Sequence, residues 1–296
     1  MNVIARIIIL LMITIPVFSN CTGKRTEVNN THTAASSEIP QPETVKKHSG
    51  LPVDAISASI GAPGYMMAGP VGTVSIHFGF PSDDQVITAT AIAPTVTLTG
   101  YPVYRDTDRN KGQHLHMVLD NGSCEEDFDT SNPFSPEKGA FNDLKEGTHT
   151  LRVFPVREWH ESIKQVEAPA FDFVVFHVKT RTPRLSINTD APILTYSQPA
   201  GEYKWDENSR GVLLDFYVAN AELGPKGFKV RYVLDGKQAR VLTQWSPVWL
   251  PFKELGPGEH RILLELLGKD DKHVTFLAGN VDYNKIERTF KILPPD

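Results

Sequence analysis

The strongest constraint on the fold is an internal repeat. Residues 141–151 and 252–262 carry Phe, Leu, Gly and His at the same four places, at an offset of 111 residues. Two further matches pair 118–120 with 233–235 and 176–178 with 290–292. A repeated unit of about 110 residues with roughly seven short strands has the size of an immunoglobulin-like sandwich. The sequence therefore predicts two copies of one small domain.

Within each copy, apolar and polar residues alternate with the period of two that marks half-buried strands. Strands are expected over 74–80, 95–99, 113–120, 148–156, 171–178, 185–187, 212–218, 230–234, 261–267 and 289–293. The 21 Gly and 22 Pro also favour short strands and turns over long helices. We predict an all-β fold with tandem immunoglobulin-like β-sandwich domains at 69–180 and 181–296. The cysteine pair of antibody domains is missing, so the prediction concerns architecture only.

The N-terminal segment predicts export and not folding. Arg6 precedes twelve apolar or small residues, too few to span a bilayer of ~30 Å, so residues 1–20 are expected to be a signal peptide. Phe18-Ser-Asn-Cys21 resembles a lipobox, in which Cys21 becomes the lipidated first residue. A plain secretory signal with a coincidental cysteine is the alternative. Residues 21–68 are expected to form a flexible tether, because 22–50 are largely polar. Residues 51–70 are apolar but broken by Gly and Pro, and packing of this part against the first domain is the alternative.

Charge and motifs exclude several functions. The formal net charge of −5 gives no field for nucleic acid. We find no phosphate-binding glycine loop and no serine nucleophile elbow in the sequence. Cys124 lies beside acidic residues in the run 124–129, which is interpreted as a solvated loop, and the thiol as an incidental one. His149 and His260 occupy equivalent repeat positions, which indicates a structural hydrogen bond at a turn.

His114 and His116 form the most suggestive motif. They lie two residues apart on one strand, so both imidazoles point to the same face and can reach one ion. Their repeat counterparts are Lys229 and Arg231, which predicts that this face is exposed to solvent. An ordinary polar face would need no further explanation.

Strand direction brings further groups toward the two histidines. The loop 105–112 precedes the His strand, and the loop 157–164 leaves its neighbour at the same end of the sandwich, so both should lie on one rim. His160 would then be a third imidazole, in an arrangement used for Zn or Cu. Three carboxylates are further candidates for the same rim: Asp106, Asp108 and Glu161.

Two other readings of these loops are weaker. Asp106, Asp108 and Asn110 resemble the start of a calcium loop, but Lys111 stands where that loop needs Gly, so a charged turn is expected. The start of a metalloprotease motif at His160 is rejected because Lys164 stands where the second His belongs. Trp159 is either a contact anchor for a partner or a cover for the end of the sandwich.

The segments Gly112-Gln-His-Leu-His-Met-Val-Leu-Asp-Asn121, 147–155 and Trp159-His-Glu-Ser162 resemble a group of uncharacterised exported bacterial lipoproteins. The resemblance covers about 65 residues of the first domain and implies placement in the cell envelope. Thr22 after Cys21, in place of Asp, further implies the outer membrane, with surface exposure left open. No activity is implied.

The primary functional expectation is a lipid-anchored, non-catalytic binding module with an unknown protein or small-molecule partner and no certain cofactor. The alternative is a periplasmic protein that binds Cu or Zn, or a metal-dependent enzyme, through His114, His116 and His160. The sequence favours the non-enzymatic reading because it offers no persuasive pair of nucleophile and base.

Overall fold

The computed structural model describes residues 73–296 except 109–110, 132–140, 165–169, 207 and 296. The expected signal peptide, Cys21 and the tether lie outside the described residues. All described residues belong to one compact unit. None of the helices among them combines the length and the apolar character that crossing a bilayer requires.

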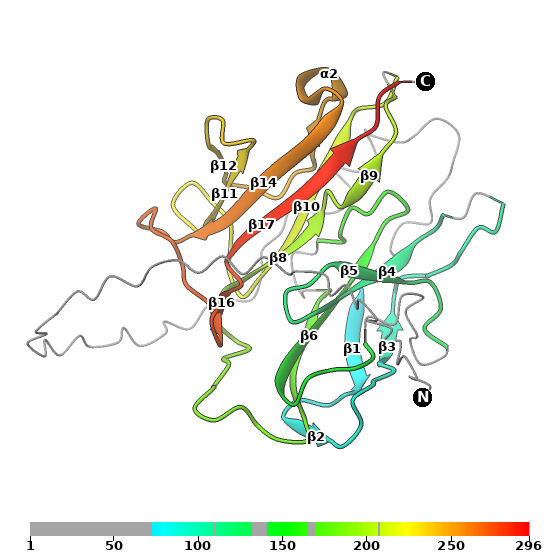
Figure 1. Cartoon of the computed structure of the whole chain (residues 1–296), viewed down its shortest axis with the longest axis vertical. Helices are drawn as coiled ribbons and strands as arrows, with labels where there is room; N and C mark the ends of the chain where they lie inside the picture. The colour runs from blue at the N-terminus through cyan, green and yellow to red at the C-terminus, as the bar shows by residue number, and fades with distance from the viewer. Residues whose placement is uncertain (1–72, 109–110, 132–140, 165–169, 207, 296) are drawn as a thin grey trace, which may run out of the picture. The chain divides into compact units, whose positions relative to one another are not determined.

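The first half of the described chain is a β-sandwich of seven strands (Figure 1). They are β1 (Ser75–Phe80), β2 (Gln85–Ile87), β3 (Thr95–Thr99), β4 (His114–Leu119), β5 (Cys124–Asp127), β6 (Gly147–Val156) and β7 (Asp172–Val178). One sheet pairs β1 with β3, and the other has the order β2-β7-β6-β4-β5. Their facing sides enclose a core that includes Leu115, Met117 and Phe176.

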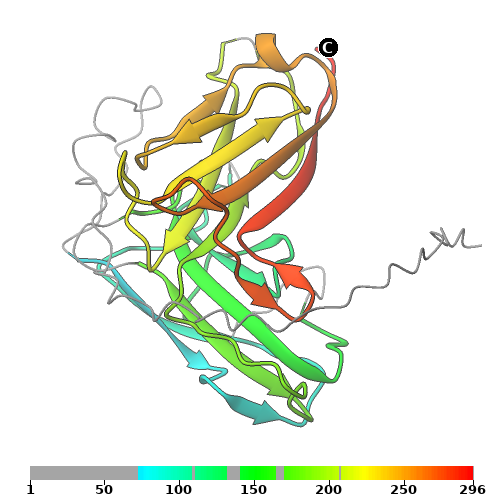
Figure 2. The ribbon, with the colours of Figure 1, turned by 90° about the vertical axis from the view of Figure 1, so that its left-hand side faces the viewer.

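The second half repeats this architecture. Its strands are β8 (Ile193–Gln198), β9 (Gly201–Tyr203), β10 (Val212–Ala219), β11 (Lys229–Leu234), β12 (Arg240–Leu242), β13 (Val248–Leu250), β14 (Gly258–Leu267), β15 (Leu277–Ala278), β16 (Val281–Asp282) and β17 (Lys285–Ile292). A single helical turn, α2 (Phe252–Leu255), precedes β14. The sheets have the orders β13-β10-β8 and β12-β11-β14-β17-β9, with the hairpin β15-β16 apart. Figure 2 shows the cyan-to-green strands of the first half below the yellow-green-to-red strands of the second.

Strand register confirms the internal repeat and the all-β prediction. His149 is paired with Phe176 across β6 and β7, and His260 with Phe290 across β14 and β17. The orders β2-β7-β6-β4-β5 and β9-β17-β14-β11-β12 correspond strand for strand, and in each sheet the first pair is parallel. The two halves are therefore copies of one immunoglobulin-like topology.

The two repeated histidines have the predicted structural role. His149 donates through Nδ1 to Asp120 at 2.6 Å and through Nε2 to the Lys145 carbonyl at 2.7 Å. His260 makes the same pair of contacts, to Asp235 at 2.9 Å and the Gly256 carbonyl at 3.0 Å. Burial alone would lower the pKa of His149, but the bonds to Asp120 outweigh it and raise the pKa. Each histidine thus ties the start of a long strand to a neighbouring turn.

Two strand predictions need correction. Residues 185–187 are not a strand, and the first strand of the second half is β8, which begins at Ile193. The run 124–129, expected as a solvated loop, contains β5, which pairs with β4. Its charge concealed the strand: Cys124 and Glu126 lie on one face, opposite Val118 and His116, and Asp127 is buried on the other. Pairing to a neighbour, and not local hydrophobicity, makes this segment a strand.

The outer face of β4 is buried, so its predicted exposure was wrong. Val118 and Phe154, on the side of their sheet that faces away from the first core, belong to the core of the second half. Phe154 contacts Tyr217 of β10, with ring centroids 5.3 Å apart. The equivalent face of the second copy carries the ion pairs Lys229–Asp271 and Arg231–Glu265 instead. The repeat comparison failed because the second sandwich covers this face of the first copy, whereas the equivalent face keeps the Arg231 and Asp271 side chains 40% and 69% exposed.

Polar contacts cross the same interface. Arg152, fully buried on β6, donates to Thr195 Oγ1 of β8 at 2.9 Å and lies over the Tyr283 ring at 4.7 Å. Burial lowers the pKa of Arg152 to about 10. Because buried polar groups are costly without partners, these bonds fix how the two halves dock.

Candidate metal centre

Three imidazole nitrogens converge at the interface between the two halves. The His114 Nε2 atom lies 3.2 Å from His116 Nε2 and 3.1 Å from His160 Nδ1, and the last two atoms are 3.2 Å apart. Around a tetrahedral Zn²⁺ with bonds of about 2.0–2.1 Å, neighbouring ligand atoms are about 3.3–3.4 Å apart. The triangle is therefore close to the size that one shared ion requires.

Strand pairing places the first two histidines and their surroundings. In the β4–β6 register, His114 is opposite Val156 and His116 is opposite Phe154. The Phe154 ring stands edge-on to His116, and the Phe128 ring stacks on His114 with centroids 4.6 Å apart. His114 and His116 are 1% and 0% exposed. Aromatic walls and burial hold both rings in one orientation.

His160 reaches the triangle because β6 continues into a tight turn. Val156 is bridged to Ser162, and Arg157 N–H donates to the Glu161 carbonyl at 2.8 Å, so the chain folds back after β6. At the tip, His160 has φ 65°, a left-handed conformation that is uncommon for a residue with a side chain. Such local strain is often retained where a side chain must be aimed at a site.

Hydrogen bonds behind the rings orient the ligand atoms. His114 Nδ1 donates to the Gly112 carbonyl at 2.8 Å, which leaves a lone pair on Nε2 in the neutral ring. His116 Nδ1 lies 3.1 Å from Ser197 Oγ of β8. Burial lowers the pKa of His114 to about 3 and lowers the pKa values of His116 and His160 as well. The imidazoles are thus neutral at pH 7, as metal ligation requires.

Glu126 completes the group, and the sequence interpretation missed it. It is opposite His116 in the β4–β5 register, and its Oε1 lies 3.7 Å from His160 Nδ1. The potential ligand atoms of the three histidines and Glu126 all lie within 4.8 Å of one another. The signal in the sequence was the Asp-Asn-Gly turn at 120–122, which predicts a hairpin after β4 and hence a strand over 124–127.

The expected carboxylates do not belong to this group. Asp106 accepts a bond from the Asp108 backbone at 3.0 Å within the turn before β4, and Glu161 accepts one from Trp159 Nε1 at 2.7 Å. The group of potential ligands contains none of the three. Trp159 is half-buried and lies beside Arg157, whose guanidinium is 5.7 Å from the ring centroid. His160 lies beside His114 and His116 as the strand directions predicted, whereas the group of potential ligands has Glu126 as its carboxylate.

Cys124 lies two residues before Glu126 in the sequence, but its thiol does not belong to the group of potential metal ligands. Its Sγ lies 3.5 Å from the Tyr196 carbonyl of β8, and burial raises the thiol pKa to about 12. The low reactivity expected of this thiol therefore has burial as its main cause, ahead of the neighbouring acidic charges.

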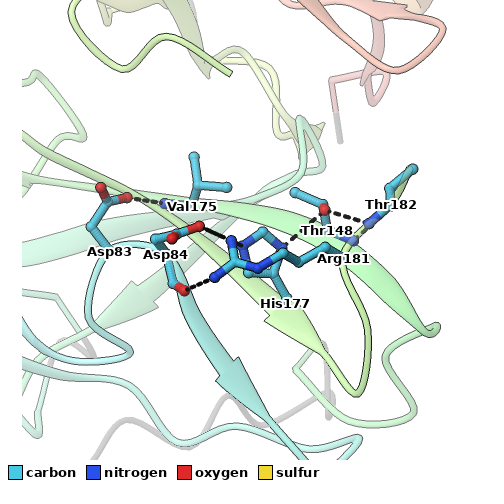
Figure 3. Close-up of polar contacts among 7 residues, drawn as sticks. All are labelled: Asp83, Asp84, Thr148, Val175, His177, Arg181 and Thr182. Atoms are coloured by element: carbon cyan, nitrogen blue, oxygen red, sulfur yellow. Dashed lines mark hydrogen bonds and ion pairs between the residues drawn. The ribbon is translucent and has the colours of Figure 1, made fainter. Parts of the chain in front are cut away.

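A second polar cluster lies at a cavity of about 480 Å³ between β7 and the segment after it. Figure 3 shows Asp84 in contact with Arg181 and His177, while His177 Nδ1 lies 3.0 Å from Thr148 Oγ1. The side-chain hydrogen bond from Arg181, followed by that from His177, lowers the pKa of Asp84 to about 2. These groups bind one another and close the edge of the sheet at β2 and β7.

Comparisons with known proteins leave the function open. No family model and no curated protein matches the chain. Fibronectin(III)-like modules of CbhA from Clostridium thermocellum match over 74% of this chain and 94% of theirs, with 12% identity and a TM-score of 0.23. SGBP-B of a Bacteroides ovatus mixed-linkage glucan utilization locus, solved with a heptasaccharide, matches over 74% of this chain and 71% of its own, with 12% identity and a TM-score of 0.18. TM-scores this low carry no argument about the site.

Proposed function

We propose that this chain is a cell-envelope protein that binds one divalent transition-metal ion, Zn²⁺ in the first instance, without catalysing a reaction. The ligands would be His114, His116, His160 and Glu126. The observation that carries the proposal is the triangle of neutral imidazole nitrogens, 3.1–3.2 Å apart, with a carboxylate beside it. Three lone pairs facing one another at this distance are stabilised by a shared cation.

The chemistry of the ligands selects the class of metal. Imidazole nitrogen suits Zn²⁺ and Cu²⁺, whereas Ca²⁺ and Mg²⁺ prefer sites built from oxygen alone. Cu⁺ prefers thiolate or thioether ligands, and this group contains none. A set of four protein ligands also leaves no position for a substrate, which is the pattern of structural zinc sites.

Metal analysis of the full chain, purified in detergent and loaded with Zn²⁺, tests the proposal. We expect one Zn²⁺ per chain, lost in the double variant His114→Ala/His116→Ala because two of the ligands are removed. His77 is exposed on β1, so His77→Ala is the matched control and should keep its metal. Absence of stoichiometric metal in the wild type would refute the proposal.

The same preparation distinguishes the alternatives that the sequence left open. Loaded with Co²⁺, a closed four-ligand site should give the intense visible absorption of tetrahedral cobalt, unchanged by added small anions. A spectrum that changes when small anions are added would show an exchangeable fourth ligand position, and it would support the alternative that the protein is a metal-dependent enzyme. Preferential retention of Cu²⁺ under competition, beyond its generally higher affinity, would favour a copper protein.

Placement in the envelope is a separate part of the proposal and rests on the N-terminal sequence. We expect a cysteine-linked acyl chain at Cys21, with stable anchoring because bacterial lipoproteins carry several chains at this residue. Cells fed an alkyne analogue of palmitate should label the wild type but not Cys21→Ser. Equal labelling of the two proteins would refute the proposed lipid anchor at Cys21 but would not affect the metal proposal.

A further inference from the structure

The turn that carries His160 is fastened to the other sandwich. Ser162 donates to Asp215 Oδ1 of β10 through its backbone N–H at 3.2 Å and through its hydroxyl at 2.9 Å. Lys164 Nζ donates to the same oxygen at 2.7 Å and to Ser162 Oγ at 2.6 Å. The residues that follow His160 by two and four positions are thus held by one carboxylate of the second half.

Asp215 is placed to do this by the alternation of β10. It lies two residues before Tyr217 and therefore on the same face, and the Tyr217 ring contacts Phe154 of the first half. The register shift in the β8–β10 pairing inserts Ser197 on β8 and leaves β10 regular. The residue is only 3% exposed, and in the described part of the chain its Oδ2 atom has no hydrogen-bond partner. A buried carboxylate is costly, and removing its charge would cost the second sandwich none of its own backbone pairing. Its bonds serve the turn of the first sandwich.

A second residue of the same sheet, on the neighbouring strand β8, supports another ligand. Ser197 of β8, 1% exposed, places its Oγ 3.1 Å from His116 Nδ1. Its neighbour Gln198 is paired with Asp215 across the strands. Contacts to both segments that carry the imidazoles, β4 and the turn after β6, therefore come from one small region of the β8–β10 sheet.

We infer that Asp215, assisted by Ser197, is a positioning residue for the metal centre, which is complete only when the two sandwiches are docked. This inference rests on the proposed function. The ligands all belong to the first sandwich, but the direction of His116 and the position of His160 are set by the second. Metal binding and docking of the halves then favour each other to the same degree, because linkage between two equilibria is reciprocal.

The test compares Zn²⁺ affinity, by competition with a chromophoric chelator, and the Co²⁺ absorption spectrum in variants of the full chain. Asp215→Ala should lower Zn²⁺ affinity roughly 10–100-fold, the usual effect of removing a group that orients a ligand, and should alter the Co²⁺ spectrum. Asp215→Asn keeps an oxygen acceptor for Ser162 and should recover most of the affinity. Ser197→Ala should weaken binding in the same direction.

Glu265→Ala is the matched control, because Glu265 is also 3% exposed on a strand of the second half and is paired with Arg231 away from the centre. It should destabilise the fold yet leave the Co²⁺ spectrum unchanged. Wild-type affinity in Asp215→Ala would overturn the inference while leaving the proposed function standing. If Asp215→Ala does not fold, Ser197→Ala and Ser162→Ala decide, and wild-type affinity in both overturns the inference. Failure of the wild type to bind Zn²⁺ is the separate failure of the proposed function.

Discussion

Phe154→Ala should lower the free energy of unfolding by roughly 3–5 kcal/mol, the usual cost of removing a fully buried aromatic ring. Phe154 is 0% exposed and lies on a strand of the first half, but its ring packs with Tyr217 in the core of the second. The loss should therefore appear in the second half as well. Three of the four tryptophans lie there, so denaturation followed by tryptophan fluorescence reports on it.

Val86→Ala provides the comparison. Val86 is 47% exposed on β2, and its truncation should change the unfolding free energy by no more than about 0.5 kcal/mol. In the wild type, fluorescence and circular dichroism should give one coincident transition. If Phe154→Ala does not change the midpoint of the fluorescence transition, the two halves unfold independently. That result would contradict the shared core.

Saturating Zn²⁺ should raise the melting temperature of the wild type by roughly 8–16 °C. Zinc at about a thousand times its dissociation constant stabilises the folded state by about 4 kcal/mol, and each kcal/mol is worth about 2–4 °C for a unit of this size. Removing one of four ligands should cost roughly a hundred- to a thousand-fold in affinity, given a total of about 10–16 kcal/mol for structural zinc. His116→Ala should thus lose most of the shift.

Differential scanning fluorimetry with and without Zn²⁺ measures this effect. His77→Ala should retain the full shift, and Mg²⁺ should produce none in either protein because the site is rich in nitrogen. An equal Zn²⁺ shift in His116→Ala and the wild type would place the binding elsewhere on the chain.

Much of the fold could be predicted from the sequence because it follows from the alternation of apolar and polar residues and from the internal repeat. Alternation gave β10 and β11, and the repeat of Phe, Leu, Gly and His gave the equivalence that the strand register shows. The meeting of His114, His116 and His160 followed from strand direction alone: β4 begins where β6 ends. These inferences needed only periodicity and chain reversal.

What the sequence did not reveal depends on contacts between distant segments. Burial of His116 results from the docking of one copy on the other, and nothing in the alternation of β4 distinguishes a face covered by a neighbour from one covered by water. Glu126 was missed because an acidic run suggests solvent, whereas an edge strand tolerates such residues. Asp215 matters through bonds to Ser162 and Lys164, more than 50 residues away, and such distant contacts have no signature in composition.

The salt bridges on the second copy have a consequence for assembly. A third sandwich stacked on that copy in the same manner would have to cover Asp271 and Arg231, whose side chains are 69% and 40% exposed in their ion pairs with Lys229 and Glu265. Removing such charges from water costs several kcal/mol per ion, and apolar neighbours would not compensate for that cost. The first copy offers imidazoles and aromatic rings to its neighbour, whereas the second offers fixed charge. Stacking is therefore directional, and the charged face protects the molecule against open-ended self-association.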